Sequence, residues 1–210
     1  GLLCWDGFSA KAMHTRQSPL LRMRENGQQL HAAVSLRENT AEGLGPDFQS
    51  EGFIRPPEVP LITEGRLDQL LVSPRTAREY GLVTNGADNG AEAPTSLEMA
   101  PGTLAQAGAL AALGTGLYVK NLWYLNFSDR MNARMTGMTR FATFWVENGV
   151  IQAPCEVMRF DDSLFQLLGE KLEALTRERE FLPDTSTYER RQTQSVRLPG
   201  ALVRDFNLTL

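Results

Sequence analysis

Apolar and polar residues alternate on both sides of the Asn26-Gly27 pair, a pattern typical of a β-hairpin. Asn-Gly favours the positive φ angles of a two-residue turn. Counting outward through residues 19–34 places Met23 opposite Leu30 on an apolar face. The other expected pairs are Leu21 with Ala32, and Arg22 with His31 on the polar face.

A second hairpin is predicted over residues 140–158, with its turn at Asn148-Gly149. The same counting places Val146 opposite Ile151, and a slip of one residue would destroy the apolar face. Since Pro154 has no N–H to donate, we expect the return strand to lie at a sheet edge or to bulge there. The remaining expected pairs are Phe144 with Ala153 and Ala142 with Cys155.

Helical spacing is less frequent along the chain. A stripe of leucines begins after a cap at Asp162 or Ser163 and predicts a helix that ends before Pro183. A short helix is expected over 74–80, and a third over 103–113. The leucine stripe consists of Leu164, Leu168, Leu172 and Leu175; Ser73 and Gly81 flank the short helix, and Gly114 and Gly116 close the third.

The remaining segments complete an α+β chain. Residues 202–210 alternate as a further strand, with Phe206, Leu208 and Leu210 on one face, and 43–60 and 83–101 are rich in Gly and Pro, which predicts loops. Strands and helices do not alternate strictly, which excludes a doubly wound sheet. The expected fold class is α+β, strand-dominated, with a mainly antiparallel sheet or partly closed barrel and a few peripheral helices.

Composition excludes several classes of protein. The chain has 210 residues, a net charge of −4 and ordinary hydrophobic content, so it can form a core but lacks the cationic excess of a nucleic-acid binder. We find no signal peptide and no apolar run long enough to span a bilayer. The chain starts Gly1-Leu-Leu-Cys-Trp5 without Met and enters an expected strand, so we interpret it as an excised piece of a longer protein, with Gly1 a candidate cloning remnant.

Candidate chemistry is sparse, and we predict no catalytic, cofactor-binding or metal-ligating residue. The two histidines, His14 and His31, lack the helical His-Glu-x-x-His spacing of zinc peptidases, and a structural or surface role is favoured for both. Cys155 is interpreted as a packed thiol facing Ala142, while the role of Cys4 stays open. The two cysteines are expected to be reduced.

Three further patterns are interpreted without a functional site. The glycines around Thr115 follow a helix and precede a strand, the reverse of a nucleotide-binding loop. Asp161-Asp162 stands where a helix cap belongs, so capping is favoured over a carboxylate pair. The mixed charge runs 177–180 and 189–191 are interpreted as solvated faces.

An ordered set of motifs resembles the C-terminal domain of the TldD/PmbA family. The set begins with Gly114-Thr-Gly-Leu-Tyr-Val-Lys120, continues with a Met135-Thr-Gly137 loop and Phe144-Trp-Val-Glu-Asn-Gly149, and ends in a return strand through Pro154 and a helix at Leu164–Leu168. Supporting matches are Glu51-Gly52, Leu70-Leu71, Thr76-Ala77, Gly81, Leu198-Pro199 and Leu202-Val203. The resemblance covers nearly the whole chain and implies a single C-terminal domain over residues 1–210.

The resemblance implies a cytoplasmic metalloprotease-related subunit that takes part in peptide maturation or degradation as a homodimer or heterodimer with a homologue. The family's His-Glu-x-x-x-His motif lies upstream of the matched region, and its Gly-x-Cys ligand is replaced here by Glu189-Arg-Arg-Gln-Thr-Gln-Ser-Val196. Zinc would therefore come from the missing half or from a partner subunit. The family's Thr-Gly-Asp-Phe-Ser stretch is altered here to Thr136-Gly-Met-Thr-Arg140.

Two functions remain open at this point. In the first, the chain forms shell and substrate channel and holds an extended peptide by adding it to a free strand edge. In the second, it is a non-enzymatic binding or interaction module, a pseudo-peptidase. Neither reading involves nucleic acid or a membrane.

Overall fold

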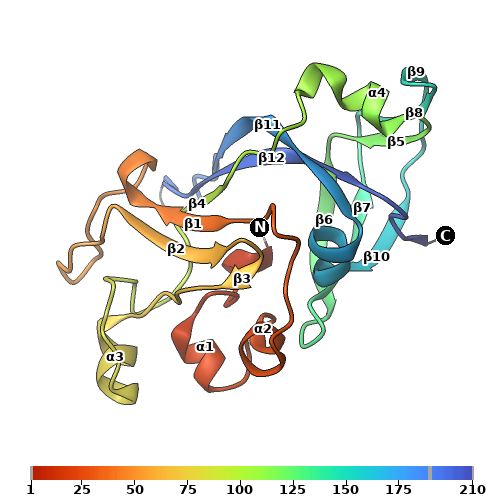
Figure 1. Cartoon of the computed structure of the whole chain (residues 1–210). Coiled ribbons are helices and arrows are strands. Elements are labelled where there is room, and N and C mark those ends of the chain that lie inside the picture. Colours follow the sequence, from red (N-terminus) through yellow and green to blue (C-terminus); the bar gives the residue numbers. More distant parts are fainter. Residues whose placement is uncertain (1, 189–190, 210) are drawn as a thin grey trace. The chain divides into compact units, whose positions relative to one another are not determined.

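The computed structural model describes residues 2–188 and 191–209, drawn in Figure 1. The chain divides into two compact units, Gly1–Ala100 with Arg179–Leu198, and Pro101–Glu178 with Pro199–Leu210.

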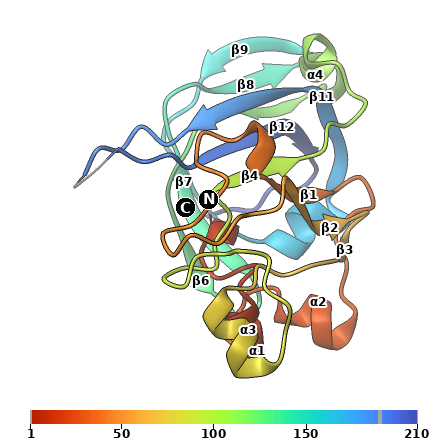
Figure 2. The same cartoon turned by 90° about the vertical axis from the view of Figure 1, so that its left-hand side faces the viewer.

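The main element of the first unit is a six-stranded sheet in the order β11-β12-β4-β1-β2-β3, of which β11 up to Glu178 and β12 from Pro199 belong to the second unit. β4 pairs in parallel with β12 and antiparallel with β1. Helices α1, α2 and α3 gather on the side of β2 and β3 in both views (Figures 1 and 2). The bounds are β1 Leu36–Asn39, β2 Glu58–Thr63, β3 Arg66–Leu67, β4 Ser96–Met99, β11 Leu172–Pro183, β12 Ser195–Val203, α1 Ala10–His14, α2 Leu21–Asn26 and α3 Pro74–Tyr80.

The second unit contains two antiparallel sheets, ordered β13-β10-β7-β6 and β5-β8-β9. The hairpin of β8 and β9 places β9 at one of the two edges of its sheet (Figure 2). The bounds are α4 Ala109–Leu113, β5 Gly116–Val119, β6 Leu122–Asp129, β7 Arg134–Thr139, β8 Thr143–Glu147, β9 Val150–Pro154, β10 Arg159–Ser163 and β13 Leu208–Thr209. The predicted class, α+β with mainly antiparallel strands and few helices, is confirmed.

Two of the predicted helices are confirmed. Helix α3 spans 74–80; the Ser73 side chain accepts the N–H of Thr76, and Gly81 ends the helix at φ +68°. Over 103–113 the helix is shorter than expected, with a 3₁₀ turn from Gln106 before α4. The chain then enters β5, as the glycine pattern predicted.

The first predicted hairpin is wrong. Residues Leu21–Asn26 form α2, and Gly27 at φ +65° is its left-handed C-cap. A positive φ serves a helix end as well as a hairpin turn. The apolar positions Leu20, Leu21 and Met23 are buried in the helical arrangement, and that burial decides between the two.

The long helix predicted from Asp162 is also wrong. Asp162 lies in β10, only a short helical segment follows through Gln166–Glu170, and Leu172 begins the strand β11. Gly169 has φ −117° and ψ −107°, which breaks the helix. Leu172 and Leu175 are buried as residues of this strand. The burial pattern of the strand is irregular, so its apolar residues show the same three-residue spacing as one face of a helix.

The second hairpin is confirmed at its turn and shifted beyond it. Val146 pairs with Ile151 as predicted, and Asn148 and Gly149 have positive φ. An extra residue on β9, Gln152, then moves the register by one. As a result Phe144 lies opposite Pro154 rather than Ala153, and the Cys155 N–H bonds the carbonyl of Thr143 instead of facing Ala142.

Four further segments differ from the prediction. The expected loop 83–101 contains β4, whose four residues are all buried, and the expected Met135-Thr-Gly137 loop lies within β7. The start of the chain forms a 3₁₀ turn at Leu2–Cys4 rather than a strand. The last predicted strand divides between β12 and β13, and Leu210 lies outside the described residues.

None of the helices within residues 2–188 and 191–209 combines the length and apolarity that a membrane crossing requires.

Candidate functional site

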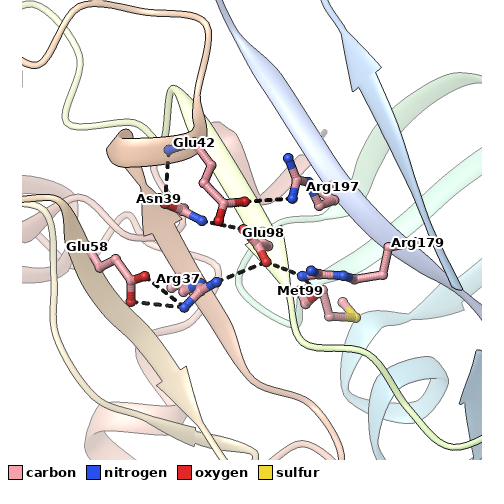
Figure 3. Close-up of polar contacts among 8 residues, drawn as sticks. All are labelled: Arg37, Asn39, Glu42, Glu58, Glu98, Met99, Arg179 and Arg197. Atoms are coloured by element: carbon pink, nitrogen blue, oxygen red, sulfur yellow. Dashed lines mark hydrogen bonds and ion pairs between the residues drawn. The ribbon is translucent and has the colours of Figure 1, made fainter. Parts of the chain in front are cut away.

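Strand register in the six-stranded sheet gathers charged side chains around Glu98. On β4, Glu98 lies opposite Arg37 of β1 and opposite Arg197 of β12. Arg179 of β11 also reaches Glu98. Residues directly opposite each other on adjacent strands point to the same face of a sheet, so these side chains meet on one face (Figure 3).

Glu98 is almost completely buried, with 3% of its surface exposed, and it is saturated by donors. Asn39 Nδ2 donates to Oε2 at 2.5 Å, Arg37 Nη2 donates to Oε1 at 3.0 Å, and Arg179 Nη1 donates to Oε1 as well. Burial alone would raise the pKa of Glu98, but the hydrogen bonds from Asn39 and the two arginines outweigh it and hold the pKa below its ordinary value. Glu98 is therefore an ionised structural carboxylate and not a proton donor at neutral pH.

Two outer ion pairs complete the cluster. Arg37 Nη1 donates to both carboxylate oxygens of Glu58 at 2.9 Å, and Arg197 Nη1 donates to Glu42 Oε2 at 2.6 Å. The three arginines balance the three glutamates, so the cluster carries no net charge. Such a balanced, bonded arrangement favours a role in fixing strands over general acid–base catalysis.

A small hollow opens on the same face beside this cluster. Its empty volume is about 170 Å³, part of which is open solvent. Ser96 and Ser195 are direct partners in the β4–β12 register and lie in its wall. The other lining residues are Asn39, Glu42, Leu97, Glu98, Phe181 and Arg197.

A second buried carboxylate, Glu92, connects two helix N-termini. It accepts the Ser9 hydroxyl at 2.7 Å, the Lys11 N–H at 2.8 Å and the Ser73 N–H at 2.8 Å. Ser9 and Ser73 are the N-caps of α1 and α3. Burial would raise the pKa of Glu92, but the hydrogen bonds it accepts, including one from Thr76, lower it overall. The carboxylate fixes both helix starts, where negative charge is favoured.

The histidines and cysteines singled out in the sequence are scattered. His14 stacks on Tyr80 with ring centroids 4.4 Å apart, and His31 is exposed, with Nδ1 accepting the Ala33 N–H at 3.1 Å. Both cysteines are free and partly buried, and burial raises the pKa of the Cys4 thiol, which disfavours its reactive thiolate. Within the described residues, no group of three or more His, Cys, Asp or Glu side chains is placed to hold a metal ion.

The prediction that Asp161-Asp162 caps a helix is wrong, because both residues lie in β10. Asp162 is buried in β10 and binds Lys171 Nζ at 2.8 Å, while Asp161 pairs with Arg134. The Ser163 hydroxyl accepts the Phe165 N–H at 3.2 Å, but the N-cap of the short helical segment is Phe165, and no side chain caps it. The two carboxylates therefore have separate cations and do not act as a pair.

Sequence reasoning missed the Glu98 cluster because β4 was assigned to a loop. The run 177–180, interpreted as a solvated face, includes Arg179, whose side chain is only 22% exposed and is bound to Glu98. Nothing in the local sequence indicates that Glu98 is buried, or that Arg37 and Asn39, two residues apart on one strand, bind it. The predicted run 189–191 includes residues outside the described part of the chain.

Comparison with known proteins identifies the family of this chain and structures with the same fold. The family model described as the PmbA/TldA metallopeptidase C-terminal domain matches residues 2–210. No curated protein matches the chain significantly.

Three solved structures share the fold. TldE from Thermococcus kodakarensis has a TM-score of 0.79 and 15% identity, with 100% of this chain and 48% of that one covered. A protein described as a DNA gyrase modulator from Thermotoga maritima has a TM-score of 0.75 and 20% identity, covering 97% and 45%. Another protein described as a DNA gyrase modulator, from Bacteroides thetaiotaomicron, has a TM-score of 0.70 and 17% identity, with 96% of this chain and 41% of that one covered. The chain thus spans less than half the length of these relatives.

Proposed function

Since this chain belongs to the PmbA/TldA metallopeptidase C-terminal domain family, we propose that it is the shell-forming half of a peptidase-related subunit. In this role it holds an extended peptide by main-chain hydrogen bonds and carries no zinc centre of its own. The observation that supports the proposal best is the outer edge of residues 179–183 in β11, the end strand of the six-stranded sheet, which pairs with no further strand among the described residues.

The distal part of β11, residues 179–183, is suited to pairing with a peptide. Residues 180–183 are exposed, and they include the large apolar side chains of Phe181 and Leu182. Earlier in the strand the Arg177 N–H bonds Leu104, on the outer side, whereas the Asp184 N–H bonds Gln194 of the segment leading into β12. Alternation along the strand therefore directs the Phe181 N–H outward, where a peptide carbonyl can accept it.

Strand β9, the edge expected from the sequence, is less suited. Its residues are all exposed, but the extra residue Gln152 interrupts its register and Pro154 offers no donor. Bulges and prolines at edges are features that oppose further strand pairing. The regular part of β9 is therefore too short for an extended peptide.

Zinc and the catalytic residues are proposed to come from elsewhere, either from the remaining half of the protein or from a TldD/PmbA-type partner in a homodimer or heterodimer. A catalytic zinc needs protein ligands such as imidazoles or thiolates converging on one ion. The described residues hold no such cluster. A cytoplasmic site of action and a role in peptide maturation or degradation belong to the same proposal.

Peptide binding can be tested through the main-chain donor of Phe181. We expect the chain to bind short unstructured peptides, and Phe181→Pro to weaken binding roughly tenfold, because one main-chain hydrogen bond is lost. Phe181→Ala is the matched control: it removes the ring and keeps the N–H. Isothermal titration calorimetry with wild type and both variants gives the comparison. Equal affinities of the proline and alanine variants would exclude β11 as the docking edge.

The pseudo-peptidase alternative differs in the behaviour of the assembled protein. The full-length protein, alone and with its co-occurring homologue, is assayed for bound zinc and for cleavage of an unfolded peptide. Cleavage supports the peptidase subunit. Peptide binding without zinc or cleavage in either sample leaves the non-enzymatic module as the function.

A further inference from the structure

The hollow beside Glu98 contains hydrogen-bond donors that the fold does not use. Ser96 and Ser195 are 6% and 5% exposed, and neither hydroxyl has a hydrogen-bond partner among the described residues. They lie opposite each other in parallel strands and therefore point to the same face. Arg197, two residues after Ser195, lies on that face too and lines the same hollow.

The guanidinium of Arg197 is held in place but incompletely paired. It lies over the Phe181 ring at 5.4 Å from the centroid, and a single nitrogen, Nη1, bonds Glu42. The side chain of Glu42 is 55% exposed, whereas that of Glu98 is 4% exposed and is bound by Asn39 and two arginines. Of the two carboxylates that line the hollow, Glu42 is therefore the one that can leave at low cost, since exposed ion pairs contribute little.

We propose that this hollow is a binding site for a carboxylate group, in which the ligand replaces Glu42 on Arg197 and accepts hydrogen bonds from the hydroxyls of Ser96 and Ser195. A carboxylate accepts up to about four hydrogen bonds and matches the planar donors of a guanidinium. When Glu42 swings out to solvent, the incoming negative charge restores the balance with the arginines. A neutral or cationic ligand would leave Arg197 uncompensated.

The ligand is an extended peptide that carries the carboxylate at its C-terminus or on an acidic side chain; this identification rests on the proposed function. Phe181 contributes to both features, because it belongs to the free edge of β11 and also lines the hollow. A peptide bound along that edge is thus close to the carboxylate site.

The test is calorimetric titration of the chain with three matched peptides: one with a free C-terminus, one amidated, and one amidated with a terminal Glu. We expect the free or the Glu-bearing peptide to bind roughly tenfold more tightly than the plain amide, as a charge-assisted hydrogen bond implies. Arg197→Gln should abolish that preference. Glu42→Gln should strengthen binding of the carboxylate peptides, because the competing internal carboxylate is gone.

Arg16→Gln is the matched control, since Arg16 forms an exposed pair with Glu25 outside the hollow. It should leave all three affinities unchanged. Equal binding of the three peptides, or an unchanged preference in Arg197→Gln, would overturn the carboxylate site while leaving peptide binding intact. If no peptide binds but acetate shifts the NMR signals of Ser96 and Ser195 in the wild type and not in Arg197→Gln, the site stands and the proposed peptide function fails. If acetate shifts nothing either, the site is rejected.

Discussion

At the scale of single residues, buried carboxylates set the structure of the first unit. Glu98 and Glu92 are both buried, yet each accepts several hydrogen bonds from groups far away in sequence. A buried charge is tolerated only when it is bonded in this way. Each of these carboxylates therefore keeps its hydrogen bonds only when several elements are correctly placed.

Replacement of Glu98 tests its contribution to stability. Glu98→Gln keeps the shape but leaves Arg179 and Arg37 without their buried counter-charge, so we expect the free energy of unfolding to fall by about 3 kcal/mol. Urea denaturation measures the change. Glu58→Gln is the control, because Glu58 is half exposed and pairs with Arg37 alone, and its loss should cost no more than about 1 kcal/mol. Similar losses in the two variants would contradict the role given to Glu98.

The lowered pKa of Glu98 has a consequence for pH dependence. In the folded state its pKa lies below the ordinary value of 4.5, so the unfolded chain binds more protons in that range. Its contribution is complete above the ordinary pKa and is lost as the pH falls through the folded value. Denaturation at a series of pH values from neutral to acidic should show the gap between wild type and Glu98→Gln narrowing at the acidic end. A gap that widens there would have the wrong sign.

Position 43 requires glycine because there is no space for a Cβ atom. A Cβ there would lie 1.9 Å from Ser96 Oγ, although the φ of −80° suits any residue. Gly43→Ala should therefore destabilise the chain by roughly 1–3 kcal/mol through overpacking. Gly108→Ala is the control, since a Cβ there meets nothing within 4 Å. Thermal unfolding of both variants distinguishes a steric cost from a general effect of removing glycine.

At the scale of elements, turn residues predict the structure correctly only where their sequence is compatible with a single kind of turn or cap. Ser73, Pro74 and Gly81 define the ends of α3, and each has the predicted role. Asn26-Gly27 and Asn148-Gly149 look alike in sequence, yet the first ends a helix and the second turns a hairpin. The difference lies in which apolar neighbours each segment can bury, and no local pattern contains that information.

The β8–β9 turn depends on Gly149. Its φ is +75°, and a Cβ there would approach Ala111 Cα to 3.1 Å. Gly149→Ala should cost roughly 1–2 kcal/mol from the left-handed conformation alone. Asn148→Gly, at φ +50°, should be neutral by comparison. Chemical denaturation gives both values, and an alanine variant as stable as wild type would exclude this turn geometry.

At the scale of the whole molecule, the family assignment and the strand-dominated fold agree, while the chain covers less than half of its structural relatives. The donation of zinc from outside this chain remains a proposal. It predicts that the purified chain, dialysed with zinc and then against buffer, retains far less than one ion per molecule by elemental analysis. Stoichiometric zinc that is lost on replacing His14 or Cys4 would contradict it.

The sequence by itself determined the family, the dominance of antiparallel strands, helix α3 and the second hairpin's turn. Those features depend on turn chemistry and alternation, which act between near neighbours. Only the tertiary structure decided that Ser96–Met99 is a central strand, that Leu172–Pro183 is a strand and not a helix, and that Arg179 meets Glu98. These outcomes depend on pairing between residues far apart in the chain, because a strand's partners and a buried charge's counter-ions lie outside its own segment.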